Sequence, residues 1–121
     1  MYTLNKHGAF KISPEQCSST QCYREGYADF EYDIELKATS LDDNGYVLDS
    51  LFLEDIGLNL FSRTPKNLPS CENVAYQIFE DVHMSYMLKA LRPPQDLKSI
   101  SVLVYPAGKK AIAIGYEWKS N

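Results

Sequence analysis

The chain has 121 residues, of which 45% are hydrophobic and 23% are charged, and its net charge is -4. The acidic balance and the lack of a basic run argue against binding to nucleic acid or to an anionic membrane surface. No apolar stretch approaches the roughly 20 residues that a membrane-spanning helix needs.

The length predicts a single domain over residues 1–121, large enough to bury a hydrophobic core. Met1–Lys11 has no continuous apolar segment of the secretory type, so we expect a cytoplasmic protein.

Cysteine and histidine usage gives no sign of a disulfide framework or of a metal site. The chain has three cysteines (Cys17, Cys22 and Cys71), and an odd number without a secretory segment argues against a disulfide framework. No Cys-x-x-Cys pair occurs, and His7 and His83 lie far apart in the sequence, so we predict no metal. We expect His7 to belong to a mobile terminus and His83 to be an ordinary helix residue.

The first half of the chain predicts two strands. Residues 8–13 have the apolar content of a short strand, which Pro14 ends. Residues 28–38 alternate strictly between apolar and charged side chains, which is typical of a long strand with one buried face. The acidic members of the other face could bind a cation or face water; we favour water, because a metal site needs ligands from several segments. They are Asp29, Glu31, Asp33 and Glu35.

Residues 42–45 then predict a turn, after which residues 46–48 could return as a short strand. Asp49 and Ser50 are good N-caps for a helix that continues to Ser62. Ser70 caps a second helix, which should stop before the proline pair at 93–94.

The C-terminal part predicts a hairpin. Residues 100–104 form a strand, 106–109 a turn and 111–118 a final strand. The order of strand, strand, helix, helix, strand, strand predicts an α+β fold, with a four-stranded antiparallel sheet and both helices on one of its faces.

Three segments, together with this order, resemble the 6-pyruvoyl-tetrahydropterin synthase family and the bacterial 6-carboxytetrahydropterin synthases. The segments are Asn44–Asp49 before an apolar helix, Pro69–Ala75 at the start of the second helix, and the closing hairpin Ser101–Trp118. The resemblance implies the tunnelling fold, in which sheets of several copies join into a barrel. It also implies a closed homo-oligomer with ligand pockets between neighbouring subunits.

The chain departs from that family at the positions of its zinc ligands. The resemblance places Pro14, Ala28 and Phe30 where the synthases carry histidines, and none of these side chains can coordinate a metal. Dihydroneopterin aldolase, a metal-free branch of the fold, carries a Lys-Pro step where this chain has Tyr105-Pro106. We therefore predict no cofactor, and a tyrosine, with an ordinary pKa of about 10, is a poor base at neutral pH.

The resemblance singles out Glu72 as the anchor for the N–H edge of a pterin-like or purine-like ring. The alternative is that Glu72 simply favours the N-terminus of its helix, as any acidic residue does. Ser70 and Cys71 could contribute a hydroxyl or a backbone N–H to the ring, or they could serve only for capping and core packing. Cys22 and Tyr105 are candidate catalytic residues.

The predicted function is that of a zinc-less homologue of 6-pyruvoyl-tetrahydropterin synthase, which binds a pterin-like or purine-like heterocycle at a subunit interface. Any catalysis would be metal-independent acid–base chemistry of an aldolase or epimerase type. The alternative is a non-catalytic oligomeric binding or scaffold protein that has lost the active site.

Overall fold

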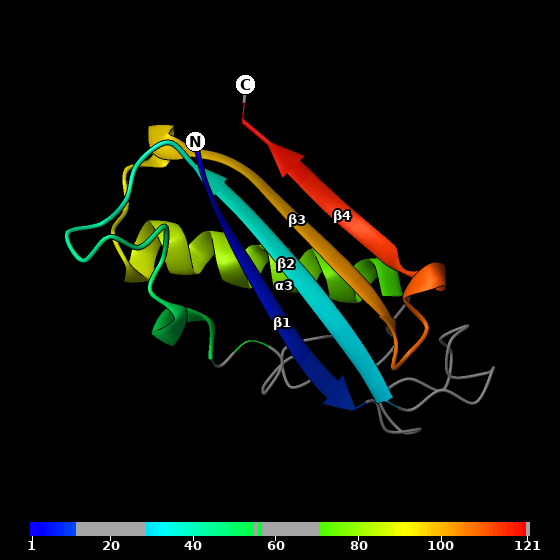
Figure 1. The fold of residues 1–121 in the computed structure, drawn as a ribbon. Helices are drawn as coiled ribbons and strands as arrows, with labels where there is room; N and C mark the ends of the chain where they lie inside the picture. The colour runs from blue at the N-terminus through cyan, green and yellow to red at the C-terminus, as the bar shows by residue number, and fades with distance from the viewer. Residues whose placement is uncertain (12–28, 55, 57–70, 121) are drawn as a thin grey trace.

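The computed structural model describes residues 1–11, 29–54, 56 and 71–120, and its four strands form one antiparallel sheet (Figure 1). The strands are β1 (Tyr2–Lys11), β2 (Asp29–Ala38), β3 (Leu97–Pro106) and β4 (Ile114–Lys119). Their order in the sheet is β1-β2-β3-β4, so strands that follow one another in the chain are neighbours in space. The predicted antiparallel sheet of an α+β fold is confirmed.

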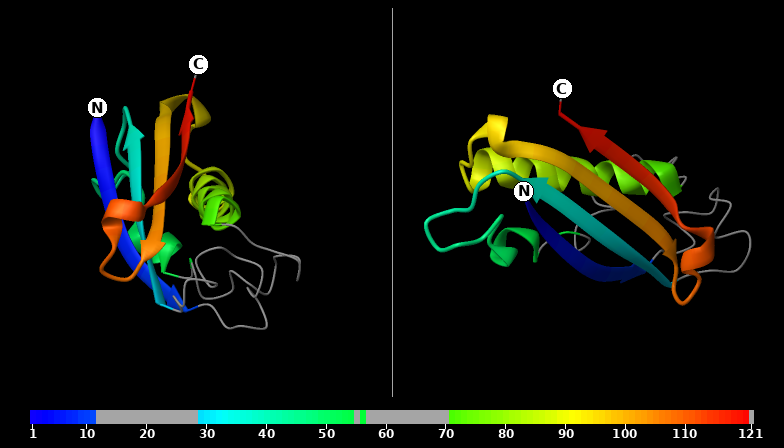
Figure 2. Two further views of the ribbon diagram at one scale, coloured as in Figure 1. Left: turned by 90° about the vertical axis from the view of Figure 1, so that its right-hand side faces the viewer. Right: turned by 45° about the horizontal axis from the view of Figure 1, so that its top comes forward.

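One long helix covers one face of this sheet. Helix α3 (Cys71–Met84) continues into a single wide turn, η2 (Ser85–Lys89), and packs against β3 and β4. Figure 2, in its left view, shows α3 on one side of the sheet. Its buried side chains recur every three or four residues, as expected for an amphipathic helix: they are Cys71, Val74, Ala75, Ile78, Phe79 and Val82. The helix ends before the proline pair at 93–94, as the sequence predicts.

The beginning of the other predicted helix is present as a short turn. The Asp49 carboxylate accepts a hydrogen bond from the Leu51 backbone N–H at 3.0 Å and caps η1 (Ser50–Leu53). Most of the remaining predicted helix, up to Ser62, lies outside the described residues. No helix in the described part of the chain is long and apolar enough to cross a membrane.

Strand β1 is longer than the sequence predicts, because it already starts at Tyr2. Gly8 pairs with Tyr32, and the tyrosine ring occupies the space that a Cβ atom at position 8 would need. A glycine at this position therefore reflects close packing between the strands.

The predicted return strand at residues 46–48 is wrong. The Asp42 side chain accepts hydrogen bonds from the N–H groups of Asn44 and Tyr46, each at 2.9 Å. The Asp42 N–H also donates to the Tyr46 carbonyl at 2.7 Å. These bonds close the turn on itself, and the chain then continues to the cap at Asp49 without joining the sheet.

The C-terminal hairpin has the predicted order with a later final strand. Residues 110–112 form a short helical turn, η4 (Lys110–Ile112), and β4 begins at Ile114. This turn places the Lys110 side chain beside β2, with its Nζ 3.1 Å from Oδ2 of Asp33.

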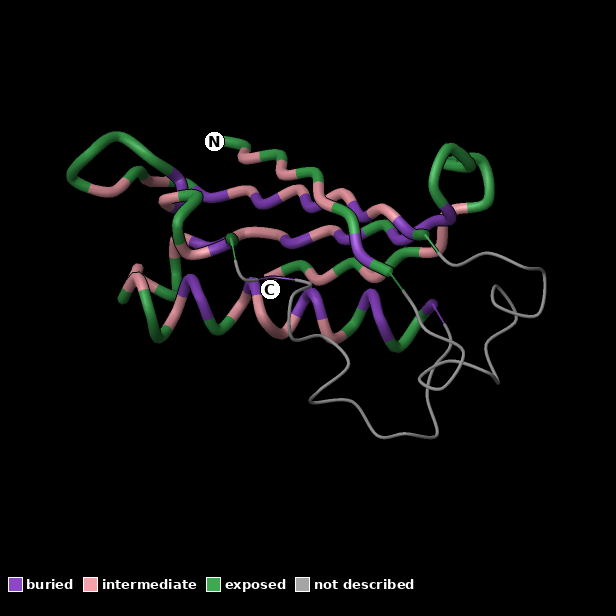
Figure 3. The backbone as a smooth tube through the Cα atoms, turned by 90° about the horizontal axis from the view of Figure 1, so that it is seen from below, coloured by how far each residue is buried: buried purple, intermediate pink, exposed green. Residues whose placement is uncertain are grey.

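The predicted alternation of β2 is confirmed, and it separates the two faces of the sheet (Figure 3). Every second side chain points to the face covered by α3 and is at most 3% exposed: these are Phe30, Tyr32, Ile34, Leu36 and Ala38. The charged side chains between them lie on the opposite side, which we call the open face. They are partly exposed from Glu31 to Lys37.

Candidate functional site

The register of the sheet brings polar side chains from three strands together on the open face. Asp33 of β2 lies between His7 of β1 and Leu103 of β3. Two residues along β2, Glu31 pairs with Tyr105 of β3. Since side chains alternate along each strand, all five belong to the same face.

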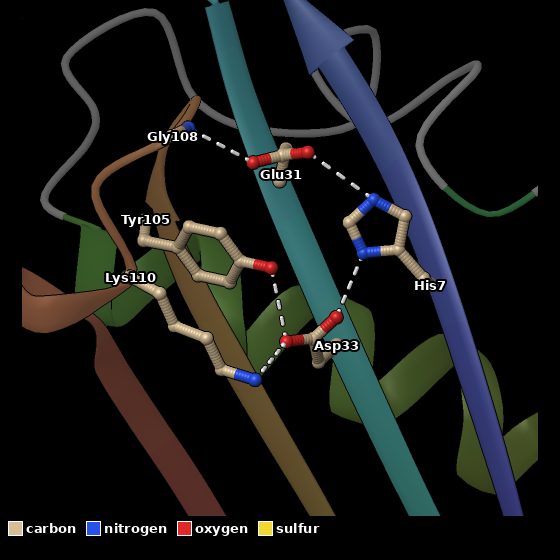
Figure 4. Close-up of polar contacts among 6 residues, drawn as sticks. All are labelled: His7, Glu31, Asp33, Tyr105, Gly108 and Lys110. Atoms are coloured by element: carbon tan, nitrogen blue, oxygen red, sulfur yellow. Dashed lines mark hydrogen bonds and ion pairs between the residues drawn. The ribbon is translucent and has the colours of Figure 1, made fainter.

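Asp33 is the centre of this cluster (Figure 4). One carboxylate oxygen, Oδ1, lies 2.8 Å from Nδ1 of His7. The other, Oδ2, accepts a hydrogen bond from the Tyr105 hydroxyl at 3.0 Å and lies 3.1 Å from Nζ of Lys110. Asp33 therefore has a partner for each oxygen, and it links β1, β3 and η4.

His7 bridges Asp33 to a second carboxylate. Its Nε2 lies 3.3 Å from Oε1 of Glu31, while its Nδ1 faces Asp33. A carboxylate can only accept hydrogen bonds, so the imidazolium form, with a proton on each nitrogen, satisfies both contacts. The expectation that His7 belongs to a mobile terminus is wrong: it lies within β1 and is held by two side chains of β2.

The β3–β4 turn completes the cluster. The Gly108 backbone N–H donates to Oε2 of Glu31 at 3.1 Å. Gly108 has a φ of 75°, a left-handed conformation that glycine adopts without steric cost. This conformation aims the N–H of the turn at β2.

The cluster shifts the pKa values of two of its members in opposite directions. Burial raises the pKa of Tyr105 to about 12, helped by the hydrogen bond to Asp33 and by the charges of Asp33 and Glu31. Burial also tends to raise the pKa of Asp33, but hydrogen bonds from His7, Lys110 and Tyr105 outweigh it, and the pKa is lowered. At neutral pH the cluster thus contains a protonated phenol donating to an ionised carboxylate.

A shallow groove of about 480 Å³ lies beside the cluster on the open face, and we call it the open-face groove. Its size falls within the range of small-molecule sites. Its lining residues are Asn5, Lys6, His7, Asp33, Ile34, Glu35, Ser101, Leu103 and Lys110. Perturbed pKa values beside a concave surface mark a candidate functional site.

The acidic side chains of β2 pair mostly with cationic and hydrogen-bonding groups. Glu31 and Asp33 contact His7, and Glu35 lies 3.6 Å from Lys37. Within residues 1–11, 29–54, 56 and 71–120, no group of three or more His, Cys, Asp or Glu side chains is placed to hold a metal ion.

The other predicted site residues lie elsewhere. Glu72 is exposed in the first turn of α3, in the layer on the opposite side of the sheet from Tyr105. Cys71, directly before it, is buried in the core. Ser70 and Cys22 lie outside the described residues. The structure thus brings Tyr105 together with His7, Asp33 and Lys110, and it does not bring Tyr105 together with Glu72 of the same copy.

Comparison with solved structures decides the fold. The crystal structure of 6-pyruvoyl tetrahydropterin synthase from Plasmodium vivax matches with a TM-score of 0.54, over 99% of this chain and 100% of that one. The chain has the tunnelling fold. The two sequences are 11% identical, so the likeness is one of fold. No known protein family and no curated protein matches the sequence.

The residues present do not fit the zinc site that the resemblance implies. Of the three corresponding positions, Phe30 lies in the described part of this tunnelling-fold chain. It is 1% exposed, and its ring stacks on Phe10 with 5.6 Å between the ring centroids. This position contributes an apolar ring to the core and has no atom that could coordinate zinc.

Proposed function

We propose that the protein binds a flat, pterin-like or purine-like heterocycle between two copies of the chain, with Glu72 as the anchor. The proposal is supported by the tunnelling fold, which the chain shares with an enzyme named for a tetrahydropterin. It is further supported by the sequence around Glu72, which resembles the segment that carries the anchor in that family.

The position of Glu72 suits the anchoring role chemically. Its side chain is exposed in the first turn of α3, so its two oxygens are accessible to a partner. A carboxylate can accept two parallel hydrogen bonds from neighbouring N–H groups of a flat ring. Cys71 is buried, so in this arrangement the residue offers the ring its backbone and not its thiol.

Any chemistry at the ring would be metal-independent, with Tyr105 acting as an acid. A phenol with a pKa of about 12 stays protonated at neutral pH, so it donates a proton more readily than it accepts one. Within one copy, Tyr105 lies on the open face with Glu31, whereas Glu72 belongs to α3 on the covered face. A ring held by Glu72 would therefore meet the Tyr105 of a neighbouring copy. Cys22 stays a candidate from the sequence alone.

The second candidate function is that of an oligomeric scaffold without catalysis. The observation that favours it is the buried stacking of Phe30 on Phe10 at a position where the synthases bind zinc. A phenylalanine in the core at this position supplies no zinc ligand, which supports a function without the zinc-dependent reaction. Assembly into a homo-oligomer is common to both candidates.

Titration calorimetry with neopterin, dihydroneopterin and guanine tests the first candidate. We expect one of these rings to bind the wild type, and Glu72→Ala to lose at least about tenfold in affinity, since a hydrogen bond to a charged group contributes about 1.5–3 kcal/mol. Glu54→Ala is the matched control, because Glu54 is an exposed carboxylate outside α3.

Equal affinity of the wild type and Glu72→Ala would remove the anchoring role. If no ring binds while light scattering shows a closed oligomer, the scaffold function is supported. A monomer at working concentration would contradict both candidates.

A further inference from the structure

The open-face groove has polar walls around an apolar floor. Along its length, one cross-strand row consists of Asn5, Glu35 and Ser101. The next row, two residues along each strand, contains the cluster around Asp33, with Lys110 beside it. A ligand in the groove would therefore face side chains from β1, β2, β3 and η4 at once.

The groove offers a ligand both a cation, Lys110, and an anion, Glu35, and these two groups lie at different cross-strand rows. The Lys110 side chain is 65% exposed and its ammonium contacts Asp33, which leaves further N–H groups for a ligand. The Glu35 side chain is 45% exposed, and the ion pair of its carboxylate with Lys37, at 3.6 Å, is too long for a good hydrogen bond. Glu35 thus retains capacity to accept, and Lys110 retains capacity to donate.

The charges of the lining side chains balance. Leaving His7 aside, the lining carries Lys6 and Lys110 as cations against Asp33 and Glu35 as anions. A groove without net charge gives no general attraction to an anion or to a cation. It complements a molecule that is neutral as a whole and carries both charges.

The floor of the groove is the side chain of Leu103, which is 37% exposed among polar neighbours. It pairs with Gly115 of β4, and a Cβ atom there would come within 2.9 Å of Cδ2 of Leu103. Because Gly115 has no side chain, Leu103 can lie flat toward β4. The result is an apolar patch that a small carbon skeleton can cover.

We propose that the open-face groove binds a small zwitterion, of which an α-amino acid is the simplest case. Its carboxylate would contact Lys110, its ammonium would contact Glu35 and its carbon skeleton would lie over Leu103. The rows that hold Asp33, the partner of Lys110, and Glu35 are two residues apart, or roughly 6–7 Å along the strand. This separation fits the neighbouring carboxylate and ammonium of one amino acid, with Lys110 donating a hydrogen bond to the carboxylate and the ammonium donating one to Glu35.

This site goes beyond the proposed function and does not depend on it. The groove lies on the open face, where Tyr105 borders it through the hydrogen bond to Asp33, whereas the anchor Glu72 belongs to α3 on the covered face. Failure of the pterin-like ring to bind would leave the groove proposal intact, and the reverse also holds.

The test is a titration of the isotope-labelled full chain with the standard α-amino acids, followed by protein NMR. We expect at least one to bind with a dissociation constant below about 1 mM and to shift the amide signals of Leu103 and Gly115. The N-acetyl and the amide derivatives, each of which lacks one charge, should bind at least about tenfold more weakly.

Each variant in the groove has a matched control variant at a position outside the groove. Lys110→Met and Glu35→Gln should each lose at least about tenfold in affinity, and Leu103→Trp should fill the floor and abolish binding. Lys119→Met and Glu117→Gln alter another ion pair, at 3.2 Å on β4, and should leave the affinity unchanged, as should Leu88→Trp. All the altered side chains are partly or fully exposed, and an amide spectrum of each variant confirms its fold.

The proposal is overturned if no amino acid binds with a dissociation constant below about 1 mM. It is also overturned if a derivative lacking one charge binds as well as the parent, or if the Lys110, Glu35 and Leu103 variants bind as the wild type does. In any of these cases, the cluster serves only to hold the β3–β4 turn against β2.

Discussion

The two faces of β2 come from one stretch of ten residues, yet they contribute to the protein in different ways. On the covered face, the side chains from Phe30 to Ala38 are almost fully removed from water. Burial of a large apolar side chain stabilises the folded state by about 1.5–3 kcal/mol. On the open face, Glu31 and Asp33 form partly exposed ion pairs, a type of contact that contributes roughly 0–1 kcal/mol. The covered face therefore carries the stability, and the open face is available for binding and chemistry.

The comparison is sharpest at two neighbouring positions, Leu36 and Glu35. Leu36 is fully buried, and Leu36→Ala should lower the free energy of unfolding by about 2–5 kcal/mol, because it leaves a cavity in the core. Glu35→Ala, one residue away on the open face, should change it by less than about 0.5 kcal/mol. Urea unfolding followed by circular dichroism measures both. Similar losses for the two variants would contradict the division between the faces.

The next effect concerns the packing of β1 on β2 at Gly8. Gly8→Ala should cost about 1–3 kcal/mol, because the added methyl group forces the Tyr32 ring to move. Moving this ring also disturbs the hydrogen bond from the Tyr32 hydroxyl to the Ile56 carbonyl, 3.0 Å long. Ala9→Val on the open side of the same strand is the control and should be nearly neutral. Thermal unfolding distinguishes them, and a neutral Gly8→Ala would argue against this close contact.

Tyr105 provides a test of the open face at high pH. Its pKa in the folded protein is about 12, above the ordinary value of 10.0. The resulting stabilisation is complete below pH 10 and is lost as the pH rises through about 12. Tyr105→Phe removes the hydrogen bond to Asp33 and should cost about 0.5–1.5 kcal/mol at neutral pH. The free energy of unfolding of this variant, measured with urea, should also fall less between pH 10 and 12 than that of the wild type. An unchanged alkaline profile would show that Tyr105 ionises as it does in the unfolded chain.

Asp33 gives the smallest expected effect, at low pH. Its pKa is lowered below the ordinary value of 3.8, so its contribution is complete above about pH 4 and is lost as the pH falls through the lowered pKa. Asp33→Asn should cost less than about 1 kcal/mol at neutral pH and should reduce the acid sensitivity below pH 4. Asp43→Asn, at an exposed position in a turn, is the control. Acid unfolding curves that coincide for the wild type and Asp33→Asn would show that the cluster does not stabilise the ionised carboxylate.

The sequence predicted those elements whose pattern is local. The alternation in residues 28–38 identified β2 and its buried face, and the apolar spacing after Ser70 identified α3. The start of β1 was missed because Lys6 and Gly8 interrupt the apolar alternation, and the reason for Gly8 is the Tyr32 ring of the neighbouring strand. The return strand at residues 46–48 was predicted wrongly because the hydrogen bonds of Asp42 close the preceding turn on itself.

For the candidate site, the sequence named Tyr105 but not its partners. His7, Asp33 and Lys110 are far apart in the chain, and only the pairing of β1, β2 and β3 with the turn at η4 brings them together. Continuing the alternation of β1 back to Tyr2 would have placed His7 on the same face as Asp33. No comparable signal in the sequence indicates Lys110, because its position depends on the path of the turn.

By itself, the sequence determined the α+β class, the order of the strands and helices, and which side chains of β2 and α3 enter the core. These properties follow from periodicity, since a strand repeats every two residues and a helix every 3.6. Only the tertiary structure decided that His7, Glu31, Asp33, Tyr105 and Lys110 form one cluster beside a groove. The physical reason is that strand register is set by pairing across the whole sheet, and a shift of one residue in a strand would turn its side chains in the cluster to the opposite face.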